Sequence, residues 1–205
     1  DSEEVGVIGI ERFQTPLLFR NAKIKRLLID EMLKNSQKLT ISFTWVNAKN
    51  ILTTDKNILV NQVYCWVLTK DYKLVLVSKD GKNWQFPGGH PHSNEPMVET
   101  CKRELYEETG IDIDGREKDL QFLGYYRVTE PDENRLHLRQ ILQVRYLLRL
   151  DIHSKDLRLK PQEKTNEPKE ERINYVSTFT LKEAIRLISW LSKSEEYKSF
   201  ISKIA

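Results

Sequence analysis

Three glutamates crowd one short stretch in the middle of the chain. Glu104 and Glu108 are four residues apart, and Glu107 lies three residues after Glu104. On an α-helix these spacings place the carboxylates in one neighbourhood, where each like-charged pair costs about a few tenths of a kcal/mol. A bound divalent cation would more than offset this cost, because hard carboxylate oxygens suit Mg²⁺. The spacing therefore indicates a metal site, although such a row without further context is more often a solvated helix face.

The residues around these glutamates are typical of a loop that leads into a helix. Residues 94–96, Asn-Glu-Pro, supply a helix start, and Gly110 supplies a stop. An apolar row at spacings of four, expected to face a sheet, is formed by Met97, Cys101 and Leu105. Upstream, Gly88 and Gly89 allow main-chain oxygens to approach the same cation. The segment thus predicts a metal site built from a glycine loop and one helix.

The whole segment resembles the Nudix box, G-x5-E-x7-R-E-U-x-E-E-x-G-U, in which U is an aliphatic residue. The residues at its fixed positions are Gly89, Glu95, Arg103, Glu104, Leu105, Glu107, Glu108, Gly110 and Ile111. The preceding residues 84–88, Trp-Gln-Phe-Pro-Gly, are similar to the aromatic and proline approach common in this family. Outside the box the resemblance is one of layout and covers residues 58–191. Residues 1–57 lie outside it.

The resemblance implies a set of metal ligands and a set of catalytic residues. In similar proteins Mg²⁺, for which Mn²⁺ can substitute, is bound by the carboxylates at the positions of Glu104, Glu107 and Glu108 and by a carbonyl at Gly88 or Gly89. Glu104, Glu108 and Arg103 are the expected catalytic residues. A further acidic ligand often comes from a later loop, where the candidates are Glu167, Glu170 and Glu171.

Two more box residues are expected to act through their neighbours. The resemblance makes Glu95 a loop anchor and Arg103 an ion-pair partner that orients the glutamates. Gly110 is the structural stop of the helix.

The family relationship implies hydrolysis of a phosphoanhydride bond in a nucleoside diphosphate linked to another group. The metal would neutralise the diphosphate and lower the pKa of an attacking water, while one carboxylate takes the proton. Two alternatives stay open: a nucleotide-binding regulator without catalysis, and an enzyme acting on RNA 5′ ends. The first does not require the full acidic set. The second requires a basic channel that a net charge of +3 does not indicate, so nucleic acid is not the expected partner.

Four aromatic or imidazole side chains are candidates for contacting the substrate. Trp84 and His90 flank the glycines, and Tyr125 and Tyr126 could stack on a base. Their ordinary roles compete with this interpretation, because loop histidines are more often exposed and strand aromatics more often pack in a core.

The remaining pattern predicts an α/β fold in which a mixed central sheet lies between helices, with an N-terminal helix and strand as an extension. The elements predicted in the first half of the chain are a helix over 15–34, a strand over 39–45 with one buried face, and a hairpin of 58–69 and 73–78. An antiparallel pair of 120–128 and 136–150 follows, and then a surface loop over 153–172. The chain is predicted to end with a strand over 173–176, a helix from the capping box at 180–183 to 191, and a last short helix. The domain boundaries expected from this are 1–57 for the extension and 58–205 for the Nudix domain.

Composition sets the remaining limits. A chain of 205 residues can bury one good core. Its two cysteines are too few for a disulfide framework, and no apolar run reaches the roughly 18 to 20 residues of a membrane span, so we expect a cytoplasmic protein. The expected ligand is a small molecule derived from a nucleotide, no membrane partner is expected, and a homodimer is left open.

Overall fold

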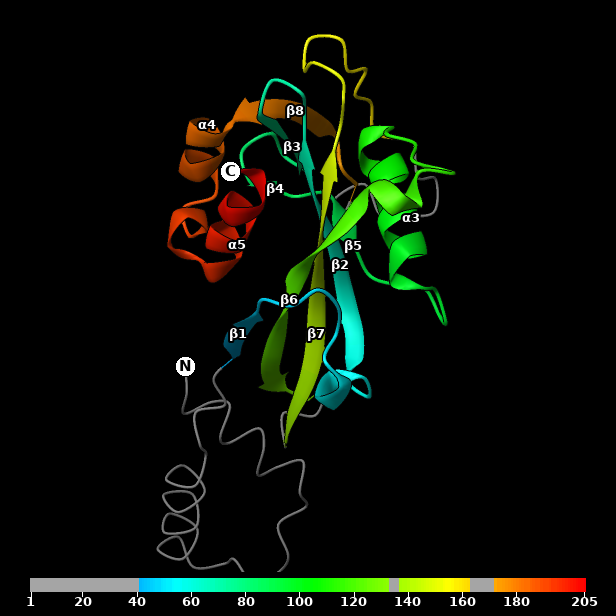
Figure 1. The fold of residues 1–205 in the computed structure, drawn as a ribbon, viewed down its shortest axis with the longest axis vertical. Coiled ribbons are helices and arrows are strands. Elements are labelled where there is room, and N and C mark those ends of the chain that lie inside the picture. Colours follow the sequence, from blue (N-terminus) through cyan, green and yellow to red (C-terminus); the bar gives the residue numbers. More distant parts are fainter. Residues whose placement is uncertain (1–40, 133–136, 163–171) are drawn as a thin grey trace, which may run out of the picture.

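A mixed sheet forms the centre of the computed structural model, which describes residues 41–132, 137–162 and 172–205 (Figure 1). Its strands are β1 (Ser42–Val46), β2 (Leu59–Leu68), β3 (Lys73–Ser78), β4 (Trp84–Gln85), β5 (Gly88–Gly89), β6 (Leu120–Pro131), β7 (Leu138–Arg149) and β8 (Tyr175–Thr180). The strand order is β1-β6-β7-β2-β3-β4, with β5 paired to β2 and β8 paired to β3. The β2 and β7 strands run parallel, and the other pairs are antiparallel, so the expected mixed sheet is confirmed.

Both predicted antiparallel pairs are present. The hairpin of β2 and β3 turns at residues 70–72, where Tyr72 adopts a φ of 59°. The β6 and β7 strands pair over their full lengths, from Leu120 opposite Leu148 to Pro131 opposite Leu138. The strand expected over 173–176 begins and ends later, as β8, because its residues pair with β3 as far as Thr180.

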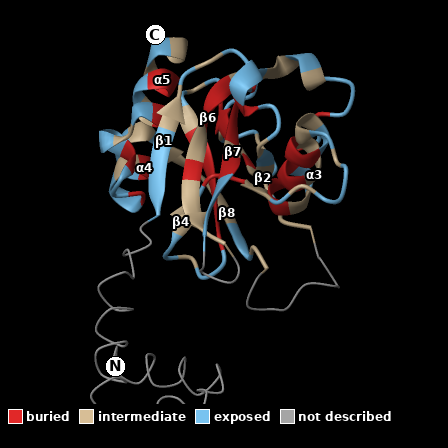
Figure 2. Cartoon of the chain, turned by 90° about the horizontal axis from the view of Figure 1, so that it is seen from below, coloured by how far each residue is buried: buried red, intermediate tan, exposed pale blue. Residues whose placement is uncertain are grey.

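Helices cover both faces of the sheet. The helix α3 (Met97–Thr109) lies on one face, and α4 (Leu181–Leu187) and α5 (Glu195–Ile204) lie on the other (Figure 1). Short 3-10 helices, η2 (Thr53–Asp55), η3 (Glu117–Asp119) and η4 (Leu191–Lys193), occupy connections. The middle strands are the most deeply buried part of the molecule (Figure 2). None of the helices in the described residues combines the length and the apolar content that a membrane span needs.

The alternation of side chains along β2 divides the core into two layers. Val63, Cys65 and Val67 point toward α3 and pack with Cys101 and Leu105, as the apolar row of that helix predicts. On the other face, a second layer is built around Trp66 and Phe200. The Trp66 ring stacks between Phe86, at 4.1 Å, and Phe200, at 4.3 Å. The C-terminal helix is thus fixed to the sheet by aromatic packing.

The capping box predicted for α4 is confirmed. The Thr180 hydroxyl accepts a hydrogen bond from the Glu183 amide, and the Glu183 carboxylate accepts one from the Thr180 amide at 2.8 Å. The predicted end of this helix at 191 is wrong, because α4 ends at Leu187 and the chain continues into η4. The apolar spacing continues through the break, since Ile188 and Leu191 still face the core. The last short helix is confirmed as α5.

The strand predicted over 39–45 corresponds to β1, but the expectation of one buried face is wrong. Phe43 is 59% exposed and Ile41 is also exposed, while Trp45 is half-buried and donates from its indole nitrogen to Ser199 Oγ at 2.8 Å. β1 is an edge strand that pairs with β6, and Trp45 connects it to α5. The helix predicted over 15–34 lies outside the described residues.

Candidate active site

The glycine strand β5 brings the backbone of the loop against the sheet. Gly88 and Gly89 pair with Tyr64 and Val63 of β2. A side chain at Gly88, whose φ is +148°, would meet the Tyr64 ring, because a Cβ there would lie 2.7 Å from Tyr64 Cδ1. At Gly89 a Cβ would lie 2.5 Å from Glu104 Oε1. Glycine is therefore required at position 88, whereas a side chain at position 89 would displace the Glu104 carboxylate, which lies directly against the Gly89 backbone.

The helix α3 holds the three glutamates of the predicted site. Glu104 and Glu108 are almost completely buried, at 6% and 7% exposure, whereas Glu107 is half-buried. The Gly88 amide donates to Glu108 Oε2 at 2.8 Å, which ties the glycine strand to the helix. The helix ends at Gly110, which has a φ of 74° and donates from its amide to the Tyr106 carbonyl. The helix boundaries predicted from the sequence are confirmed.

Arg103 connects the glutamates to the loop. Its guanidinium donates twice to Glu95, at 2.8 and 2.9 Å, and to Glu104 Oε1 at 2.7 Å and Glu107 Oε2 at 3.2 Å. It also donates to the His90 carbonyl at 2.9 Å. Glu95 accepts in addition from the His92 amide, at 2.9 Å. These charge-assisted bonds tie the loop at Glu95 to α3 through Arg103.

The ion pair of Glu95 and Arg103 makes stability depend on pH. The Arg103 guanidinium lowers the pKa of Glu95 to about 2, from a usual value of 4.5. A depressed carboxylate pKa adds stability above the unfolded-state value, and this contribution disappears as the pH falls from 4.5 toward 2. We expect Glu95→Gln to lower the free energy of unfolding by on the order of 1 kcal/mol at about pH 6, and by less at about pH 3. Denaturant unfolding at both pH values measures this difference.

A matched control lies on the same helix. Glu99 is 52% exposed and contacts Lys102 at 3.3 Å, so Glu99→Gln should change stability little at either pH. A difference between the Glu95 variant and the natural protein that does not shrink at low pH would contradict the assignment.

The oxygen donors fit a hard divalent cation. The carboxylates of Glu104, Glu107 and Glu108 come from one helix face, and the backbone of β5 lies against Glu104 and Glu108. Carboxylate and carbonyl oxygens are the ligands that Mg²⁺ and Mn²⁺ prefer. Among the described residues, no three acidic, histidine or cysteine side chains lie close enough together to hold a metal ion as they stand. Arg103 Nη1 lies instead between Glu104 and Glu107.

The chain returns to the end of α3 after β7. The amides of Lys160 and Gln162 donate to the carbonyls of Thr109 and Glu107, at 3.0 and 2.7 Å. These bonds satisfy carbonyls that a helix C-terminus leaves without partners. The loop glutamates of the predicted ligand set, Glu167, Glu170 and Glu171, lie outside the described residues.

A pocket of about 300 Å³ lies on the face of the sheet opposite α3. Its apolar lining consists of Tyr64, Trp84, Phe86, Ile188 and Trp190. Its polar lining consists of Gln62, Gln85, Gln143 and Arg145. Tyr64 pairs with Gly88, and residues 85 and 86 lead directly into the glycine strand, so the pocket and the glutamate cluster both border β5. Burial raises the pKa of Tyr64, and the charges of Glu108 and Glu104 act in the same direction.

The four predicted substrate contacts have different surroundings. Trp84 lines the pocket and packs edge-on against Phe179. His90 is exposed and contributes its carbonyl to Arg103. Tyr126 contacts Trp45 and lies outside the pocket lining.

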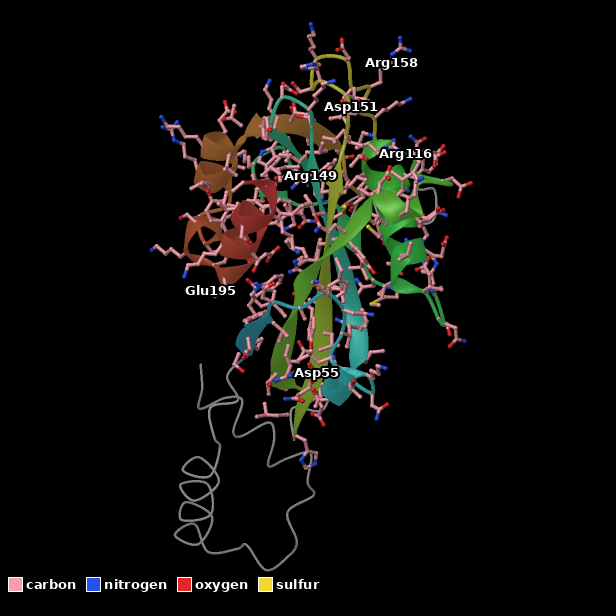
Figure 3. The ribbon with its side chains drawn as sticks, in the orientation of Figure 1. Asp55, Arg116, Arg149, Asp151, Arg158 and Glu195 are labelled. Carbon is pink, nitrogen blue, oxygen red and sulfur yellow. The ribbon has the colours of Figure 1, made fainter. Side chains whose placement is uncertain are left out.

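Tyr125 differs from the expectation that it could stack on a base. Its side chain is completely buried, and its hydroxyl donates to Asp55, which also pairs with Arg127 at 2.7 Å. Asp55 lies near the lower end of the sheet (Figure 3). The ring packs in the core layer under α3 and presents no face to a ligand in this structure.

Sequence reasoning missed most of the pocket. The sequence pattern places Tyr64, Gln62, Gln143 and Arg145 in strands and gives none of them a part in a site. Gln143 and Arg145 could have indicated a site, because they are polar residues in an otherwise apolar stretch of β7. A strand buried on both faces does not explain polar residues at these positions.

The comparisons with known proteins agree with this layout. The NUDIX domain model matches residues 59–198. Among solved structures, the chain is similar to the NUDIX domain of Shewanella oneidensis NrtR complexed with ADP ribose, with 14% identity, 76% of this chain and 95% of that chain covered, and a TM-score of 0.50. It is also similar to the C. elegans Ap4A hydrolase, with 13% identity, coverage of 71% and 98%, and a TM-score of 0.47.

The pyrophosphohydrolase BsRppH of Bacillus subtilis is a further match, with 19% identity, coverage of 70% and 73%, and a TM-score of 0.43. No curated protein matches the chain at a significant level. The likeness to the NrtR domain supports the fold alone. The domain model covers well over half of the sequence, including the whole box from Gly89 to Ile111. The chain therefore belongs to the Nudix family.

Proposed function

We propose that this chain is a metal-dependent hydrolase that cleaves a phosphoanhydride bond in a nucleoside diphosphate-linked substrate by water attack. The observation that carries the proposal is the glycine strand β5, which has the carboxylates of Glu104 and Glu108 against its backbone and the Tyr64 wall of the pocket beside it. One substrate molecule could then place its diphosphate at the glutamates and its nucleoside in the pocket. Bound Mg²⁺ or Mn²⁺ would neutralise the diphosphate and lower the pKa of the attacking water.

The residues of α3 have different roles in the proposed mechanism. Glu104, Glu107 and Glu108, with a carbonyl of Gly88 or Gly89, would hold the ion. Glu104 is the favoured acceptor for the proton of the water, because its carboxylate is fixed by packing against Gly89.

Arg103 has two separate tasks in this proposal. Its paired bonds to Glu95 anchor the loop, while its contact with Glu104 screens the carboxylates from one another. The same Glu104 oxygen is a proposed metal ligand, so a bound ion would compete with Arg103 for it. We expect the two bonds to Glu95 to hold the Arg103 guanidinium beside the loop when the ion takes that oxygen.

The pocket suits the nucleoside part of the substrate. A volume of about 300 Å³ lies at the small end of the range for ligand sites, and the indoles of Trp84 and Trp190 provide flat apolar surface. The amides of Gln62, Gln85 and Gln143 offer both donors and acceptors. Aromatic surface with a few polar groups is typical of sites that bind a base.

A nucleotide-binding regulator without catalysis is the main alternative. Binding alone would not require two nearly buried carboxylates beside a glycine strand, since burying charge is costly without a compensating partner. A panel of nucleoside diphosphate derivatives, incubated with Mg²⁺ and followed by mass spectrometry of the products, tests the proposal. We expect at least one member to be split into two phosphate-containing products. Binding of a panel member without turnover of any would favour the regulator.

A further inference from the structure

Among the described residues, Arg145 is the one charged side chain that lines the pocket. The amide side chains of Gln62, Gln85 and Gln143 line it as well, without a carboxylate from the described part of the chain. A guanidinium donates only, and a glutamine amide can turn its donor toward whatever acceptor is present. A ligand that binds here must therefore present acceptors toward Arg145.

The hydrogen bonds of Arg145 leave part of its fork available. Nε donates to Glu196 Oε1 at 3.0 Å, Nη1 to the Val144 carbonyl at 3.2 Å and Nη2 to Gln143 Oε1 at 3.3 Å. These bonds use three of the five N–H groups of a guanidinium. Among the described residues, one N–H on each Nη atom has no partner. An arginine that binds two neighbouring acceptors through its fork uses one N–H from each of two nitrogens.

The charge of Arg145 is already balanced. Glu196, on α5, is fully buried and accepts from both Arg145 and the Trp66 indole, at 2.6 Å in the second case. The guanidinium is also held between the rings of Tyr64 and Tyr126, at 4.7 and 5.4 Å from their centroids. A paired and clamped arginine attracts an additional anion less than a free one does. It therefore suits a neutral acceptor edge better than a second phosphate.

We propose that this pocket selects an oxopurine base, guanine or hypoxanthine, over adenine, with Arg145 as the residue that determines the selectivity. The inference rests on the proposed function only in placing a nucleoside in the pocket. The O6 and N7 atoms of an oxopurine are two neighbouring acceptors, which is the pattern that a guanidinium fork recognises. Adenine places an amino donor in the position of O6, so that donor would face donor and leave polar groups without partners.

Binding of nucleoside monophosphates to the full chain tests the selectivity without requiring turnover. Titration calorimetry with IMP, GMP, AMP and the 7-deaza analogue of GMP separates the contributing atoms. We expect GMP and IMP to bind at least about 10-fold more tightly than AMP, and the loss of N7 to remove part of that advantage. IMP shows whether the 2-amino group matters. Equal affinities, tighter binding of AMP, or no binding of any of the four would overturn the inference.

A charge-conserving variant tests the role of Arg145 itself. Arg145→Lys keeps a cation beside Glu196 but removes the fork, so the preference for GMP over AMP should fall to within about 2-fold. Arg139, on the same strand, pairs with Glu130 at the surface, and Arg139→Lys should keep the full preference. If Arg145→Lys does not fold, the double variant Arg145→Met with Glu196→Gln removes the buried pair as a unit. A folded variant of either kind that retains the preference would overturn the assignment.

The inference and the proposed function fail in different ways. Selective binding of oxopurines without hydrolysis of any nucleoside diphosphate derivative would overturn the hydrolase alone. Hydrolysis that proceeds equally well with guanine and adenine substrates would overturn the selectivity alone.

Discussion

Glu108→Gln should lower kcat by at least about 100-fold. The substitution keeps the shape of the side chain, and an amide oxygen can still accept the bond that Gly88 now donates to Glu108 Oε2. The fold of the loop should therefore survive. What is lost is the negative charge of a nearly buried carboxylate in the proposed donor set. Steady-state kinetics with one identified substrate, with thermal unfolding as a check on the fold, measures the effect.

Metal removal should have the same consequence. An excess of chelator should abolish turnover, and Mg²⁺ or Mn²⁺ should restore it, because the carboxylates of α3 hold the ion in the proposed mechanism. Glu99→Gln is the matched control, since this glutamate lies on the same helix but is exposed and pairs with Lys102. Full activity in excess chelator, or a Glu108 variant as active as the Glu99 variant, would refute the mechanism.

The sequence predicted local elements well and their long-range pairing poorly. The hairpin of β2 and β3 and the helix α3 follow from turn residues and periodicity within one segment. The parallel pairing of β2 with β7 joins residues about 80 apart, and no local pattern specifies it. Phe43 shows a second limit. Alternation tells which residues share a face, but not whether another element covers that face.

The same distinction applies to the candidate site. The glutamates of α3, the glycines of β5 and the pair of Glu95 with Arg103 come from one continuous segment, so one motif could indicate all of them. The pocket is assembled from β2, β4, β7 and the residues around Ile188, which only the sheet brings together. Tyr125 and Tyr126 are adjacent in β6 and point to opposite faces, so at most one of them could reach the pocket face.

Two kinds of carboxylate compete as the proton acceptor, namely Glu104 on α3 and the loop glutamates Glu170 and Glu171, which lie outside the described residues. Glu104 lies against Gly89 and is held by Arg103 at 2.7 Å, so it is positioned before any substrate binds. A carboxylate that uses its lone pairs on a cation is, however, a weaker base.

Glu104→Gln should lower kcat by about 100-fold or more, while Glu170→Gln and Glu171→Gln each cost less than about 10-fold. The reason is preorganisation: a group that packing already holds in place pays no entropy on reaching the transition state, whereas fixing a backbone residue costs about 1 to 2 kcal/mol. Measuring kcat for the three single variants with one substrate at saturating Mg²⁺ separates the cases, since a larger loss at Glu170 or Glu171 than at Glu104 assigns the proton to the loop.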